Sequence, residues 1–136
     1  MSSFTSPLLV SVLIDGKNWQ LERPFTFHIG SRYSRTYVKV PRYFLTDWAS
    51  IPKLLTLFLP DWAKFNKSPV LHDWLYSTKM IMGEAITRKQ ADDIFLEAMM
   101  ICWQDFPKRN IVAYLEYYAV RIFAFLAWRN KRVCRK

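Results

Sequence analysis

Cysteine and histidine are both scarce in this sequence of 136 residues. Two cysteines, Cys102 and Cys134, are too few for the disulfide framework of a small secreted domain, so we expect a reducing compartment. Two histidines, His28 and His72, are too few for the metal clusters of many phosphohydrolases, which use several histidines together. These two shortages remove two common classes of small protein.

Acidic residues are also in the minority, with 11 Asp and Glu against 20 Lys and Arg, which gives a net charge of +9. Such an excess favours an anionic partner: nucleic acid, an anionic lipid surface or an acidic protein patch. Because the sequence has no helix-turn-helix or zinc signature, nucleic-acid binding depends on charge alone and is the weakest of the three.

The longest apolar run, residues 111–128, is interrupted by Glu116 and Arg121 and is therefore a poor membrane span. It is better interpreted as a core or interfacial helix, in which Arg121 reaches an acid or an exposed carbonyl. No basic region precedes the first apolar stretch of the chain, so we expect no signal peptide. The apolar residues of this helix recur at helical spacing: Ile111, Tyr114, Leu115, Tyr118, Ile122, Phe125 and Leu126.

The residues that are abundant predict a single α+β domain over residues 1–136. Hydrophobic residues make up 51% of the chain, which is enough for a core without cross-links. Residues 1–43 form the β-rich part: antiparallel strands, namely a hairpin that turns at Asp15-Gly16 plus one or two short strands. Residues 44–136 form a bundle of about four helices, expected at 50–59, 68–78, 87–103 and 108–130.

The second of these helices carries the more promising histidine. Ser68 and Pro69 are a good helix start, with a hydroxyl at the N-cap and a proline at the first position. His72 and Tyr76 are four residues apart and share a face, whereas Asp73 lies about 100° around the helix. The histidine, the phenol and this acid can therefore border one cleft.

The third helix supplies a second acid. Thr87 and Gln90 match a capping box, which places the helix start at Thr87. Asp92 then falls on the inward, apolar face, whereas Asp93 falls on the solvent side. Because a buried carboxylate needs a partner, we expect Asp92 to meet His72 or Tyr76.

A neutral histidine held by an aspartate can act as a general base toward water. In that hypothesis His72 is the base, Asp92 orients it and Tyr76 fixes Asp92. Asp73 is then available for a hard cation such as calcium, with Asp47 as an additional ligand or, alternatively, as a turn or capping acid. The competing hypothesis is that the same polar residues only brace two helices.

The pattern His72-Asp73-x-x-Tyr76, followed by Ala91-Asp92 and Phe95, resembles the core of the secreted-type phospholipases of the A-two class. The resemblance is strongest to the compact versions in bacteria, fungi and parvovirus capsids. It implies a lipid-ester hydrolase in which His72 is the base, Asp73 binds calcium and Asp92 orients the histidine. Those enzymes also hold calcium with a glycine-rich loop before the histidine, and this chain has no glycine there.

A longer pattern covers most of the chain: Phe44-x-Thr-Asp-Trp-Ala-Ser-Ile-Pro52, then Leu71-His-Asp-Trp-Leu-Tyr76, then Arg88-x-x-Ala-Asp92. It resembles an uncharacterised domain family of tailed bacteriophages and prophages. This resemblance implies a phage protein of the host cytoplasm or the virion. Its expected partners are an anionic membrane surface or other phage structural proteins.

These observations leave two functions open. One is a phospholipase-like hydrolase at a membrane surface, and the other is a non-catalytic tail, baseplate or assembly protein. The hydrolase requires one nitrogen of His72 to face solvent, whereas a ring enclosed by the protein is typical of a structural role.

Overall fold

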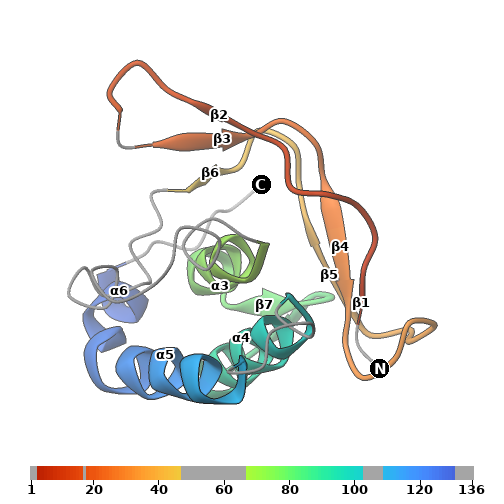
Figure 1. The fold of residues 1–136 in the computed structure, drawn as a ribbon, viewed down its shortest axis with the longest axis vertical. Helices are drawn as coiled ribbons and strands as arrows, with labels where there is room; N and C mark the ends of the chain where they lie inside the picture. Colours follow the sequence, from red (N-terminus) through yellow and green to blue (C-terminus); the bar gives the residue numbers. More distant parts are fainter. Residues whose placement is uncertain (1–2, 17, 47–66, 103–108, 131–136) are drawn as a thin grey trace.

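A computed structural model describes residues 3–16, 18–46, 67–102 and 109–130 of the chain. Antiparallel strands occupy the first part of the chain and helices the second, which confirms the predicted α+β class. The strands curve around one side of the helices (Figure 1). Asp47 and the helix expected at residues 50–59 lie outside the described residues.

The strands form two three-stranded sheets and one small hairpin. The first sheet has the order β1-β4-β5 and the second the order β2-β3-β6, with antiparallel neighbours throughout. The members of the first sheet are β1 (Ser3–Phe4), β4 (Phe25–His28) and β5 (Tyr37–Val40). The members of the second are β2 (Val10–Val12), β3 (Trp19–Leu21) and β6 (Leu45–Thr46).

Alternation of apolar and polar residues decides which face of the first sheet is buried. Phe25 and Phe27 of β4 are buried, and the residues opposite them, Val40 and Val38 of β5, are buried too. Side chains on successive residues of a strand point to opposite faces, so these four rings and branched chains form one apolar surface. That surface belongs to the same core as the helices.

The helices of the described residues are α3 (Lys67–Thr78), α4 (Arg88–Cys102), α5 (Arg109–Phe123) and α6 (Phe125–Asn130). The capping box at the start of α4 is confirmed, because Gln90 N donates to Thr87 Oγ1 at 3.1 Å and Thr87 N donates to Gln90 Oε1 at 2.8 Å. The helix expected at 108–130 is divided at Ala124. Hydrogen bonds from Ala124 N to Val120 O and from Trp128 N to Ala124 O nevertheless connect its two halves.

The segment between α3 and α4 is a hairpin of β7 (Met80–Ile81) and β8 (Glu84–Ala85). Its turn residues Met82 and Gly83 both have positive φ, at 50° and 84°, as a type I′ turn requires. Methionine is not a residue that signals such a turn, which is why the sequence did not predict it.

Helix α3 lies at the centre of the molecule, with the strands on one side and α4, α5 and α6 on the other (Figure 1). Eight of its twelve residues are buried. Its polar side chains are consequently inside the protein and need polar partners there. Among the described helices, none is long and apolar enough to cross a membrane.

Candidate functional site

Asp92 is the centre of the buried polar cluster. It lies on the inward face of α4 and has no exposed surface. Its Oδ1 is 2.7 Å from His72 Nε2 and accepts a hydrogen bond of 2.6 Å from Tyr76 OH. Its Oδ2 accepts a hydrogen bond of 2.8 Å from Arg121 Nη1. One carboxylate therefore connects α3, α4 and α5.

His72 and Tyr76 reach Asp92 together because they are one helical turn apart on α3. Their ring centroids are 4.1 Å apart, and Phe95 of α4 packs against the imidazole with a centroid distance of 4.4 Å. Trp128 of α6 packs edge-on against Tyr76 at 5.1 Å. These aromatic contacts exclude water and fix the orientation of both rings.

Arginines from α4 and α5 compensate the buried negative charge of Asp92. Besides Arg121, Arg88 of α4 places its Nη1 3.6 Å from Asp92 Oδ2. The same guanidinium donates from Nη1 to Val120 O at 3.2 Å and from Nη2 to Arg121 O at 3.0 Å. Arg88 therefore attaches the start of α4 to the backbone of α5.

Asp93 makes a parallel connection nearer the surface. It accepts a hydrogen bond of 2.7 Å from Lys89 Nζ and another of 2.6 Å from Tyr117 OH. The hydrogen bond to Asp93, together with burial, raises the pKa of Tyr117 to about 12. The sequence prediction that Asp92 faces inward and Asp93 outward is confirmed, since the Asp93 side chain is 45% exposed.

Hydrogen bonding determines the protonation states in the cluster. Burial on its own would raise the pKa of Asp92, but the hydrogen bonds from His72, Tyr76 and Arg121 outweigh it and hold that pKa below its ordinary value. Burial and the hydrogen bond to Asp92 raise the pKa of Tyr76. Because the Asp92 carboxylate can only accept, Nε2 of His72 must carry a hydrogen.

This arrangement fixes the tautomer and plane of His72, as a general base requires. When the ring is neutral, its lone pair is on Nδ1. Both Nδ1 and the ring as a whole are buried, however. In the described arrangement the cluster holds three helices together, and proton transfer from water would require Nδ1 to become accessible.

Of the two expected metal ligands, Asp73 and Asp47, only Asp73 lies in the described residues. Asp73 is buried on α3 at 2% exposure. Within residues 3–16, 18–46, 67–102 and 109–130, no group of three or more His, Cys, Asp or Glu side chains could hold a metal ion. These residues do not by themselves make a calcium site.

Residues 19–120 match a family model described as a protein of unknown function, DUF1353. The chain belongs to the DUF1353 family. No curated protein and no solved structure matches the chain. The DUF1353 match includes His72, Tyr76 and Asp92, whereas Arg121 follows it directly.

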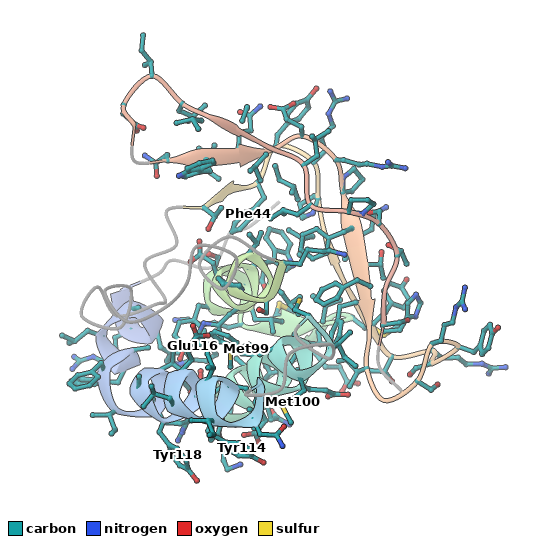
Figure 2. The ribbon with its side chains drawn as sticks, in the orientation of Figure 1. Phe44, Met99, Met100, Tyr114, Glu116 and Tyr118 are labelled. Carbon is teal, nitrogen blue, oxygen red and sulfur yellow. The ribbon has the colours of Figure 1, made fainter. Side chains whose placement is uncertain are left out.

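A second feature of this DUF1353 chain is an exposed apolar stripe on α5 and α6, which we call the outer face. The sequence predicted the stripe but left open whether it is buried. Its members are Ile111, Tyr114, Leu115, Tyr118, Ile122, Phe125 and Leu126, all of them exposed. The side of these helices that is buried carries smaller residues instead, Ala113, Val120 and Ala124. In Figure 2, Tyr114 and Tyr118 point away from the protein, whereas Glu116 points toward its interior.

Polar contacts explain why α5 is turned about its axis so that its large apolar residues face outward. Arg121 and Tyr117 bond to Asp92 and Asp93, and Arg88 holds two α5 carbonyls, so the polar side of α5 must face α4. Small residues beside these contacts let the two helices approach closely. The large apolar residues are left exposed on the opposite side, so the interpretation as a core helix is wrong for them and the interfacial helix stays a prediction.

Proposed function

We propose that this protein works at an anionic membrane surface and meets it with the outer face of α5 and α6. The observation that carries the proposal is the stripe of seven exposed apolar side chains, which covers one side of two successive helices. Contiguous apolar patches of this kind on a protein surface mark contact sites. The aromatic members, including Tyr114 and Tyr118, suit the boundary between lipid headgroups and acyl chains.

The charges around the outer face favour lipid over a neutral protein partner. The only acid between residues 109 and 130 is Glu116, which is buried, whereas Arg129 is exposed. The sequence after Asn130 adds four more basic residues, Lys131, Arg132, Arg135 and Lys136. Each cation near an anionic bilayer contributes about 1 kcal/mol of attraction, which salt weakens.

Vesicle binding tests the proposal. The full chain is expected to sediment with vesicles that contain phosphatidylglycerol, and more weakly with pure phosphatidylcholine vesicles. Ile122→Glu should weaken binding roughly tenfold or more, because one inserted isoleucine contributes about 1.5–3 kcal/mol. Ile14→Glu is the matched control, since Ile14 is fully exposed between β2 and β3 and belongs to neither α5 nor α6.

The outer face could instead bind a second copy of the chain, and this alternative needs its own measurement. Light scattering over a range of concentrations reports dimerisation. A dimer that Ile122→Glu dissociates, together with no vesicle binding by the wild type, would overturn the membrane proposal.

Lipid-ester hydrolysis is a second candidate, supported by the contacts of His72 and Tyr76 with Asp92 and opposed by the burial of the His72 ring. His72 would take a proton from water through Nδ1 once that atom became accessible, while Asp92 held the ring through Nε2. The assay is fatty-acid release from a short-chain phospholipid, with calcium and with a chelator. Release that His72→Ala abolishes supports hydrolysis; no release under either condition removes it.

A phage origin, which the resemblance of the sequence implies, would limit where such a protein acts. As a tail, baseplate or assembly component it would be present in purified virions, whereas as a protein of the infected cell it would fractionate with host membranes. Mass spectrometry of both fractions separates these alternatives.

A further inference from the structure

A groove of about 1040 Å³ lies between the segment Tyr37–Leu45 and the end of α3 with its following hairpin. From α3 it takes Trp74, Ser77 and Thr78, and from the hairpin residues 80–83. Trp74 is two residues from His72 and from Tyr76, which places it on the opposite side of the helix. The groove is therefore separate from the buried polar cluster.

The lining of the groove is aromatic, methionine-rich and basic. Its aromatic and methionine members are Tyr37, Tyr43, Phe44, Trp74, Met80 and Met82. Among the described residues its charged members are Lys39 and Arg42, and none of its described members is an acid. Flexible methionines beside rigid rings suit apolar side chains of varied shape, and the two cations suit a ligand that also carries negative charge.

One wall of the groove is an open sheet edge. β5 is the last strand of its sheet, beyond β4, in the described part of the chain. The hydrogen bond from Ile29 N to Thr36 O and the pairing of Phe27 with Val38 show which residues of β5 direct their backbone groups toward β4. In this pattern the N–H and C=O of Tyr37 and Lys39 point away from β4.

Backbone strain is also concentrated at this groove. The non-glycine residues with positive φ in the described chain are Tyr43 at 71°, Lys79 at 55° and Met82 at 50°. Tyr43 and Met82 line the groove, and Lys79 lies between the lining residues Thr78 and Met80. Each such conformation costs on the order of 1 kcal/mol and is concentrated at ligand sites in other proteins.

We propose that an extended peptide segment with alternating apolar and acidic residues adds to the open edge of β5 and fills this groove. Its backbone pairs with Tyr37 and Lys39, its apolar side chains pack on Trp74 and Met80, and its acids lie near Lys39 and Arg42. A peptide fits better than a small molecule because the groove volume is at the upper end of the roughly 300–1,000 Å³ of small-molecule sites. Strand addition is an established mode of peptide recognition.

The test begins with selection of random twelve-residue peptides on the immobilised full chain. Enriched peptides are expected to alternate apolar with acidic residues. Their affinity should fall roughly tenfold or more in Lys39→Pro, which removes an outward N–H without touching the bonds to β4. Lys39→Ala keeps that N–H and should lose only the contribution of the charge. Circular dichroism confirms that each variant is folded.

The backbone of a selected peptide gives a second readout. Only every second N–H of the bound peptide faces β5. Methylation of those backbone nitrogens should therefore abolish binding, whereas methylation of the nitrogens between them should leave binding unchanged. Bound peptide should also slow hydrogen exchange at the amides of Tyr37 and Lys39. No enrichment, or enriched peptides that bind Lys39→Pro as well as wild type, would overturn the proposal.

Discussion

Glu116 makes the stability of this protein depend on pH in an unusual direction. Its side chain is 1% exposed, and neither carboxyl oxygen has a hydrogen-bond partner among the described residues. Burial raises its pKa to about 8, from an ordinary value of 4.5. The folded protein therefore binds one more proton at Glu116 than the unfolded chain does between these two pH values.

The sign of the effect follows from this difference in proton binding. Stability falls with pH wherever the folded state holds more protons, so the stability present below pH 4.5 is lost as pH rises toward 8. A shift of about 3.5 pH units at about 1.4 kcal/mol per unit gives a maximum of about 5 kcal/mol. Water that enters to solvate the ionised carboxylate would reduce the loss, and we expect roughly 2–5 kcal/mol.

Urea unfolding of wild type and Glu116→Gln at a series of pH values measures the effect. Glutamine has nearly the same shape and cannot ionise, so the variant should lack this loss and be the more stable protein at pH 8. The difference between the two curves is the useful quantity, because it cancels the contributions of all other titrating groups. Asp92 and Asp93, whose pKa values are lowered, contribute the opposite slope, but at pH values below about 4.

Glu84→Gln provides the control, because it removes the same charge from an exposed position on β8. Its curve should run parallel to that of wild type. Parallel curves for Glu116→Gln and wild type between pH 5 and 9 would show that Glu116 ionises in the folded protein without cost. The argument from burial would then be wrong.

Three further predictions concern the links between helices and the cap of α4. Tyr76→Phe should lower the free energy of unfolding in urea by about 1–3 kcal/mol, because it removes a hydrogen bond to the buried Asp92. Tyr117→Phe loses a hydrogen bond to the half-exposed Asp93 and should cost less than about 1 kcal/mol. Equal losses in the two variants would contradict the argument from burial. Arg121→Gln should cost about 3–5 kcal/mol, because it leaves the buried Asp92 charge partly uncompensated, and a neutral result would show that Arg88 suffices. Thr87→Ala should cost about 0.5–2 kcal/mol and increase hydrogen exchange in the first turn of α4; unchanged exchange there would mean that the cap is dispensable.

The contacts of the polar cluster could be predicted from the sequence because each one follows from a local rule. Helical spacing puts His72 and Tyr76 on one face, and an acid on the apolar face of the next helix must find a partner. Arg121 was expected to reach an acid or a carbonyl, and it reaches Asp92. The catalytic role of these residues stays a prediction.

The rotation of α5 could not be predicted in the same way. Its strongest periodic signal is the large apolar stripe, which is typical of a buried face. The orientation of α5 is set instead by Tyr117 and Arg88, which bond to groups on another helix. The sequence near these two residues does not indicate their partners. The two-residue strands β1 and β6 were missed for a similar reason, because they depend on pairing with residues far along the chain.

Most amphipathic helices use the same apolar residues to hold the helix in place and to form its apolar surface, so replacing them endangers folding. In α5 the polar links do the first of these, so the apolar residues are left for the second. The large apolar residues are not needed to hold α5 in place, since hydrogen bonds to Asp92, Asp93 and the α5 backbone do it. Relatives could therefore exchange the whole stripe for residues suited to another binding surface while keeping the same architecture.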